Sequence, residues 1–317
     1  MHELSCGEGK SVRMIEMRVS LQGIITSVKG QALPDIYRMN QEEMEGLPYH
    51  VLHEEQIREG VQTLFIRQRT GEVIPVQIAA VSESEGWKLW IESLFGDKRD
   101  ELRLNYLETA FKSIAYVAEY GDPDLSDHLS RVASYTRFLA ESLGWTPMDV
   151  KRIEIASLVH DVGKTAIPRE LLFKPGHFLR EERKYMEQHT ERGHLIIEEL
   201  ESRIRDGWMI DRKLFELARN VTLYHHENWD GSGYPSGRKE VDIPQESRLV
   251  RVVDAIDALL SFRVYKQTWP WERAKDELLQ YRGSQFDAEI VDNLLKHEDA
   301  FLKVAQKMNT RLSGAVV

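Results

Sequence analysis

The chain has 317 residues, of which 42% are hydrophobic and 30% charged, so it is long enough for two globular domains with substantial cores. Its net charge of −10 argues against a polymeric nucleic acid partner, although a local cationic or metal site could still bind a small anion. Cys6 is the only cysteine, which excludes an intrachain disulfide and a thiolate metal site. With neither a bilayer-spanning apolar run nor a signal-peptide pattern, we expect a cytoplasmic protein with no membrane partner.

Residues 1–96 are expected to form a small α+β regulatory domain. Apolar runs predict short strands near residues 19–26, 61–67, 73–81 and 87–93, and residues 41–45 are helix-prone. The segments GIITSVKG (23–30), EEMEGLPYHVLHEEQ (42–56) and TGEVIPVQ (70–77) resemble pieces of PAS-like sensor domains. Another small α+β module is the alternative. No cofactor ligand is evident, and His50 and His53 are expected at the surface.

A connecting helix is predicted over residues 97–120, followed by an all-helical domain over residues 121–317. In the connecting helix, Leu107, Phe111, Ile114 and Ala118 are spaced as one apolar stripe, which could join the two domains rigidly or lie in a homodimer seam. Further helices are predicted over residues 127–143, 180–200, 213–224, 248–260 and 271–280, and another one begins with Thr146 as its N-cap and Pro147 at its first position. The fold class is therefore mainly α.

The segment RIEIASLVHDVGK (152–164) predicts an amphipathic helix that ends at Gly163, with His160 and Asp161 near its C-terminal end. A carboxylate can bridge two cations while a neighbouring imidazole holds one of them, and Lys164 could meet a phosphate one turn further on. Taken alone, such a pair more often belongs to a structural hydrogen-bond network. Its significance depends on the residues that accompany it.

Further histidines and carboxylates fall on the predicted helices. They are His128, His189, His225, His226, Asp254 and Asp257. Asp254 lies in the apolar run RLVRVVDAIDALL (248–260), where a buried carboxylate needs a cation or hydrogen bonds. Imidazole and carboxylate ligands without thiolate suit iron, manganese or zinc, and shared carboxylates favour more than one ion.

Together these segments resemble the HD-GYP family of cyclic di-GMP phosphodiesterases. The matching pieces are HLSRV (128–132), HDVGKTAIP (160–168), QHTERG (188–193), HHENWDGSGYP (225–235) and DAIDALLSFRVYK (254–266). The resemblance implies an all-helical HD-type catalytic domain that uses divalent metal ions to hydrolyse cyclic di-GMP to the linear dinucleotide, and further to GMP in some members. Two alternatives stay open: a receptor that binds the dinucleotide without cleaving it, and a phosphohydrolase acting on another cyclic dinucleotide or nucleotide.

The same resemblance implies roles for individual residues. One metal ion, iron or manganese, would be held by His128, His160, Asp161 and Asp254. The second would be held by Asp161, His189, His225 and His226. Lys164 would stabilise charge on the phosphoryl oxygens, Tyr234 would shape the substrate cleft, and Arg263 and Lys266 would contact the phosphates. A second copy of the chain or a signalling protein is the expected macromolecular partner.

Asp124 decides how many metal ions are expected. Some members of the family bind a third ion through a glutamate four residues before the histidine that matches His128, and this chain has Asp124 there. The aspartate is one methylene shorter, while metal–oxygen distances tolerate only a few tenths of an ångström. Asp124 also lies at a predicted helix start, where it could serve as a cap. We therefore predict two metal ions, with a third weakly bound or absent.

Overall fold

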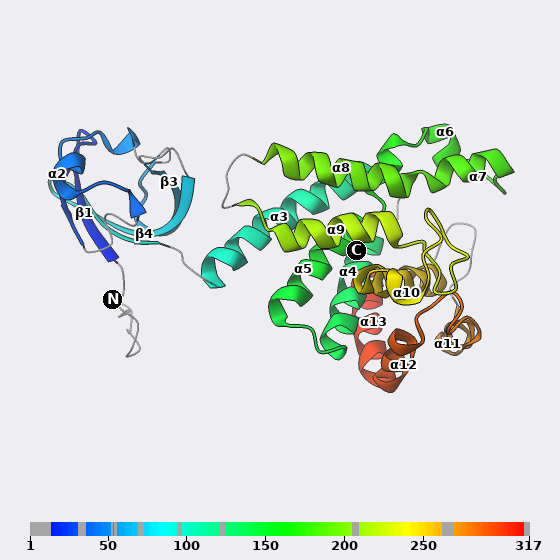
Figure 1. The fold of residues 1–317 in the computed structure, drawn as a ribbon. Helices are drawn as coiled ribbons and strands as arrows, with labels where there is room; N and C mark the ends of the chain where they lie inside the picture. The colour runs from blue at the N-terminus through cyan, green and yellow to red at the C-terminus, as the bar shows by residue number, and fades with distance from the viewer. Residues whose placement is uncertain are drawn as a thin grey trace. The chain divides into compact units, whose positions relative to one another are not determined.

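The computed structural model of the protein describes residues 14–30, 36–51, 53, 56–68, 73–93, 97–118, 120, 125–204, 209–261 and 269–313 (Figure 1). The chain divides into two compact units. The N-terminal unit comprises residues 1–103 and 206–210, and the helical unit comprises residues 104–205 and 211–317. The mainly α fold with a smaller α+β part is as predicted.

One antiparallel sheet forms the centre of the N-terminal unit. Its strands are β1 (Met14–Ser20), β2 (Ile25–Lys29), β3 (Gly60–Arg67), β4 (Val73–Glu83) and β5 (Gly86–Ser93), in the order β2-β1-β5-β4-β3. Ile15, Met17 and Val19 alternate along β1 and are buried, so one face of the sheet carries the core. The strand predictions are confirmed, whereas the resemblance to PAS domains stays a prediction.

The buried face of this sheet packs with short helical segments, α2 (Gln41–Met44) and η1 (Tyr49–Val51). The expectation for His53 was wrong, because this side chain is 1% exposed. Its ring stacks on Tyr49 with 4.2 Å between centroids, and its Nε2 lies 2.7 Å from the Tyr37 hydroxyl. Burial lowers the pKa of His53 to about 3, so the ring is neutral at physiological pH. His50 is exposed, as expected.

The helical unit begins within α3 (Asp97–Ala118). Its other helices are α4 (Leu125–Ser142), α5 (Pro147–Ser157), η2 (Val162–Ala166), α6 (Arg169–Leu172), α7 (Arg180–Glu187), α8 (His189–Arg203), α9 (Arg212–Tyr224), η4 (Glu240–Asp242), α10 (Gln245–Leu260), α11 (Trp271–Gln280), α12 (Ala288–Lys296) and α13 (Glu298–Ser313). Each predicted helix is present near its expected position, except for two corrections given below. The helices α6, α12 and α13 were not predicted.

One large hydrophobic core joins most of these helices. In α4, Val132, Tyr135 and Leu139 are buried at spacings of three and four residues, which is the spacing of one helix face. This helix packs against α5, α10, α12 and α13, while α9 packs against α5, α8 and α10. The apolar stripe of α3 is also in this core, with Leu107 and Phe111 buried.

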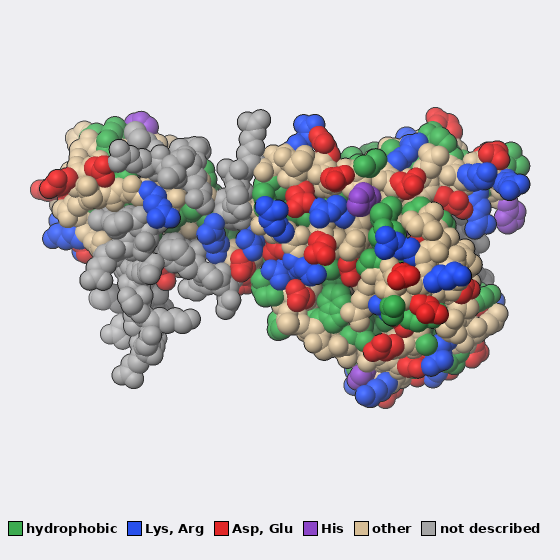
Figure 2. Space-filling model, in the orientation of Figure 1, with side chains coloured by type: hydrophobic (Ala, Val, Ile, Leu, Met, Phe, Trp, Pro, Cys, Tyr) green, Lys and Arg blue, Asp and Glu red, His purple; other side chains and the backbone are tan. Residues whose placement is uncertain are grey.

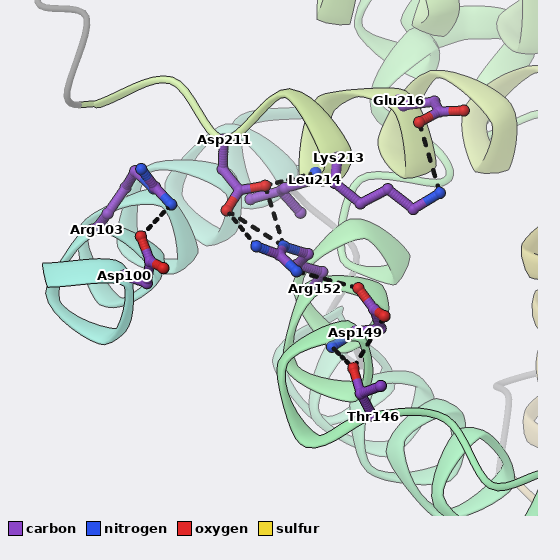
Figure 3. Close-up of polar contacts among 9 residues, drawn as sticks. All are labelled: Asp100, Arg103, Thr146, Asp149, Arg152, Asp211, Lys213, Leu214 and Glu216. Carbon is purple, nitrogen blue, oxygen red and sulfur yellow. Dashed lines mark hydrogen bonds and ion pairs between the residues drawn. The ribbon is translucent and has the colours of Figure 1, made fainter. Parts of the chain in front are cut away.

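An ion pair joins the middle of α5 to the start of α9 (Figure 3). Asp211 caps α9 by accepting a hydrogen bond from Leu214 N at 2.9 Å, and its carboxylate also binds Arg152 of α5 at 3.1–3.2 Å. Thr146 caps α5 as predicted, through a bond from Asp149 N. The two helices that lead to the histidine motifs are therefore fixed to each other between the middle of α5 and the N-cap of α9.

Two helix boundaries differ from the prediction. The helix expected to run to Gly163 ends at Ser157, and the helix expected over residues 180–200 breaks at Gln188 into α7 and α8. Gly163 lies in η2, where a Cβ atom would overlap the carbonyl oxygen of His189 and come 2.5 Å from Gly193 N. The glycine is thus required by the close approach of η2 to α8, not by a helix end.

Among the described residues, no helix combines the length and the apolar character needed to cross a bilayer. On the visible face of the helical unit, acidic and basic side chains are interspersed and neither sign forms a continuous patch (Figure 2).

Candidate metal centre

The side chains of the candidate site come from the ends of helices and from the loops between them. His160 and Asp161 lie in the turn between α5 and η2, His189 begins α8, and His225 and His226 directly follow α9. His128 lies in the first turn of α4, and Asp254 lies in the middle of α10. Elements far apart in sequence therefore converge on one buried place.

Asp161 is the centre of this arrangement. Its Oδ1 atom lies 3.3 Å from His189 Nε2 and 3.7 Å from His225 Nε2, and its Oδ2 atom lies 3.2 Å from His160 Nε2 and 2.6 Å from Lys164 Nζ. Burial acts to raise the pKa of Asp161, but the charge of Lys164, followed by His160, holds that pKa well below its usual range. The carboxylate is therefore ionised at neutral pH.

Three of the histidines are oriented by the same kind of hydrogen bond, from Nδ1 to a backbone carbonyl three or four residues earlier. The pairs are His160 with Ser157 at 2.8 Å, His189 with Met186 at 2.7 Å, and His225 with Val221 at 2.9 Å. A carbonyl oxygen can only accept, so each Nδ1 atom carries the hydrogen. The Nε2 atom of each ring, which carries the lone pair when the ring is neutral, consequently faces Asp161.

His128 is oriented by a carboxylate instead. Its Nδ1 donates to Asp257 Oδ2 at 2.7 Å, and the buried Asp257 also binds Arg131 Nε at 2.5 Å and the Ser261 hydroxyl at 3.1 Å. Burial acts to raise the pKa of Asp257, but the hydrogen bonds from His128 and Arg131 lower it. Asp257 thus positions a candidate ligand without belonging to either group of candidate ligands. Arg131 was not predicted to belong to the site, although its position one turn after His128 in the same helix could have indicated it.

The candidate ligand atoms form two groups, each with all its atoms within 4.8 Å of one another. One group contains Asp161, His189, His225 and His226, and the other contains His128, His160 and Asp161. Asp161 belongs to both. This is the arrangement in which one carboxylate can bridge two cations.

The donor set fits divalent cations. The Nε2 atoms of His189 and His225 lie 3.4 Å apart beside an ionised carboxylate, so lone pairs and a negative charge face one another in a buried space. Burial lowers the pKa of His189 to about 4 and the pKa of His226 well below its usual range, so protons do not neutralise this arrangement at pH 7. A cation would remove the repulsion, and neutral imidazoles whose other nitrogen is hydrogen-bonded are the usual protein ligands.

Asp254 is the predicted ligand that the structure does not bring into either group. It is half-buried, and its charge acts on Tyr234 and on Arg251. Burial raises the pKa of Tyr234, and the charges of Asp161 and, to a smaller extent, Asp254 act in the same direction, so both carboxylates lie near the phenol. The role of Asp254 as a metal ligand stays a prediction.

Tyr234 lies directly beside the candidate ligands. Its ring stacks on His226 with 4.8 Å between centroids. The loop that carries it is held by Glu227, which accepts from Ser236 N at 2.7 Å, and by Arg251, which donates to Asn228 Oδ1 at 3.2–3.3 Å. Arg251 was not predicted as a site residue, since its contact with this loop joins distant parts of the chain. The close backbone packing of the loop also leaves no room for a Cβ atom at Gly233.

Three predicted residues, Asp124, Arg263 and Lys266, lie outside the described residues. Their roles therefore stay predictions. Lys164, predicted to meet a phosphate, has its ammonium at Asp161, on the edge of the candidate ligand cluster.

Several characterised proteins are similar to this chain. A probable cyclic di-GMP phosphodiesterase of Vibrio cholerae is 37% identical over 64% of this chain and 47% of its own length. A 3′3′-cGAMP-specific phosphodiesterase 2 of the same organism is 35% identical over 61% of this chain and 35% of its own length. A cyclic di-GMP phosphodiesterase of Thermotoga maritima is 34% identical over 64% of this chain and 52% of its own length. The matches thus cover about half, or less, of these relatives' lengths.

The similarity to a protein family falls on the helical part of the chain. A model of the HD domain family matches residues 113–290, which include every residue of the two candidate ligand groups. Because this match covers more than half of the chain, the protein belongs to the HD domain family.

Proposed function

We propose that the helical unit is a metal-dependent phosphodiesterase that hydrolyses cyclic di-GMP. The observation that carries this proposal is the ionised Asp161 shared by two groups of imidazoles, whose Nε2 lone pairs converge in a buried space. The names of similar proteins support the substrate class, since they include phosphodiesterases for cyclic di-GMP and for 3′3′-cGAMP.

Two cations would be held in the proposed enzyme. His128, His160 and Asp161, with Asp254 as the further predicted ligand, would hold one, and Asp161, His189, His225 and His226 would hold the other. A nitrogen and oxygen donor set suits iron or manganese, and we propose no well-occupied third site. When bound, such a pair supplies Lewis-acid activation of water and neutralises charge on a phosphoryl group.

The remaining residues bind and orient the substrate. Lys164 places a positive charge beside Asp161, where it would stabilise the phosphoryl oxygens as charge develops on them. Tyr234 covers His226 and would form one wall of the substrate cleft. Arg263 and Lys266 would bind phosphate oxygens through charge-assisted hydrogen bonds.

Product analysis tests the proposal. Metal-loaded protein is incubated with cyclic di-GMP, 3′3′-cGAMP and cyclic di-AMP, and the products are separated by chromatography. Cyclic di-GMP should give the linear dinucleotide, and Asp161→Ala should abolish cleavage, whereas Asp299→Ala at the exposed start of α13 should not. Binding of cyclic di-GMP without cleavage by fully metallated protein would support the receptor alternative, and cleavage of a different dinucleotide alone would change the substrate.

The phosphate-binding assignment has a separate test. Arg263→Ala should raise KM for the dinucleotide about tenfold or more, the scale of one charge-assisted hydrogen bond. Its metal content should equal that of the unmodified protein, because Arg263 is not a proposed ligand. Loss of metal, or an unchanged KM, would contradict the assignment.

We propose a regulatory role for residues 1–96, since they contribute no residue to the two ligand groups. Residues 97–120 would connect this domain to the catalytic domain over residues 121–317. A signal received by the first domain, or association with a second copy or a signalling protein, would then act on hydrolysis through the connecting helix. Hydrolysis rates with and without a candidate signal molecule would test this role.

A further inference from the structure

A pocket of about 360 Å³ lies next to the candidate metal centre. Its lining comes from the turn before α7, the last turns of α7 and the loop that carries Tyr234. The side chains that matter here are Phe178, Met186 and Tyr234, which are apolar or aromatic, and His177, Arg183 and Glu187, which are polar. None of them belongs to the proposed metal ligands.

Tyr234 connects this pocket to the metal centre. Its ring stacks on His226 and lies 6.3 Å from the His189 ring, while the same residue lines the pocket. The charges of Asp161 and Glu187 both act on its phenol. A group bound in the pocket would therefore be separated from the proposed metal ligands only by the side chain of Tyr234.

The size and lining of the pocket suit one base of a dinucleotide. Small-molecule pockets range from about 300 to 1,000 Å³, so this one is near the lower limit and too small for a whole cyclic dinucleotide. Proteins that bind unpaired bases stack them on aromatic side chains and read their edges with polar groups. Phe178 and Tyr234 offer the aromatic contacts, and Glu187 offers a polar group.

Glu187 gives the pocket its chemical preference. The Watson–Crick edge of guanine presents N–H groups at N1 and N2, and a carboxylate accepts both. Adenine presents a lone pair at N1, which repels a carboxylate. Arg183 Nε lies 3.3 Å from Glu187 Oε1, but Arg183 is 74% exposed, so this pair is weak. A carboxylate has about four acceptor positions, so the pair leaves capacity for a base.

We propose that this pocket is a guanine-binding subsite, in which Glu187 accepts hydrogen bonds from the base edge and thereby selects guanine over adenine. The inference rests on the proposed function, because a cyclic dinucleotide would bring the base to this position. It adds a residue that determines which dinucleotide is bound.

Mononucleotide binding tests the subsite without requiring catalysis. Calorimetric titrations of the metal-loaded full chain with GMP and with AMP are compared for the unmodified protein, Glu187→Gln and Glu181→Gln. Glu181 is the matched control because it is an exposed glutamate of α7 that does not line the pocket. We expect GMP to bind at least tenfold more tightly than AMP, and Glu187→Gln to weaken GMP binding about 10- to 100-fold with little effect on AMP.

Four results have definite meanings. Equal affinity for GMP and AMP in the unmodified protein, or equal weakening of both in Glu187→Gln, overturns the subsite. The subsite is also overturned if Glu187→Gln loses its bound metal, because the effect would then arise from the metal centre. If GMP is preferred through Glu187 while the protein cleaves no cyclic dinucleotide, the subsite stands and the proposed phosphodiesterase activity fails.

Discussion

Replacing Asp257 with alanine should weaken the metal centre although it removes none of the candidate ligand atoms. Asp257 is 1% exposed, and it accepts hydrogen bonds from His128 Nδ1 and from Arg131, which is 2% exposed. The substitution leaves a buried guanidinium without its carboxylate and leaves the His128 ring without the acceptor that orients it.

The expected magnitudes follow from these contacts. Removing one partner of a buried ion pair costs about 3–5 kcal/mol of unfolding free energy. In a domain of this size, each kcal/mol lowers Tm by about 2–4 °C, so the helical unit should melt roughly 6–20 °C lower. Losing the group that orients a ligating histidine lowers metal affinity about 10- to 100-fold.

Thermal melts followed by circular dichroism, together with metal competition against a chelator, measure both effects. Arg131→Met in the Asp257→Ala background should restore at least about 2 kcal/mol, because the buried charge that lost the Asp257 carboxylate is removed. Metal affinity should stay low, since His128 still lacks its acceptor. Asp276→Ala, at an exposed position of α11, should change stability by less than about 0.5 kcal/mol. A double variant as unstable as Asp257→Ala, or an unchanged metal affinity, would refute the reasoning.

Three further changes have defined outcomes. Asp211→Ala should lower the stability of the helical unit by about 2–4 kcal/mol in urea melts, because the α9 cap and the Arg152 pair are both lost, whereas Asp211→Asn should keep the cap and lose less. In the N-terminal unit, burial lowers the pKa of His53 to about 3, so below pH 6.5 the unfolded form binds a proton that the folded form does not. Amide exchange should therefore show about 2 kcal/mol less stability of this unit at pH 5 than at pH 7. His53→Gln should remove the part of this loss that comes from His53. Gly163→Ala should force η2 away from α8 and reduce bound metal, as measured by elemental analysis, and full metal content would contradict the packing argument.

The helices and most candidate ligands could be predicted because their signals are local. The apolar spacing in α4 and α10 marks the buried faces, and Thr146 and Pro147 mark the start of α5. His128, His160, Asp161, His189, His225 and His226 are found together because each lies in a short segment with a distinctive pattern. The convergence of these segments came from the family resemblance, not from the spacing alone.

Features that depend on contacts between distant residues were not predictable in this way. Arg131 and Asp257 are 126 positions apart, so their pairing has no local signal. Gly163 reads as a helix end in sequence, but its real constraint is the backbone of α8. His53 is followed directly by two glutamates, and the positions of Tyr37 and Tyr49 account for its burial.

The carbonyl groups that anchor the three histidines also set the electric field of the site. Ser157, Met186 and Val221 lie in the last turns of α5, α7 and α9, so three helix C-termini point their negative dipole ends at one place. Such a field attracts cations and repels anions before any ligand bond forms. A dianionic dinucleotide should therefore bind poorly to metal-free protein. In the proposed enzyme, metal binding would then precede substrate binding, and the supply of metal would control it.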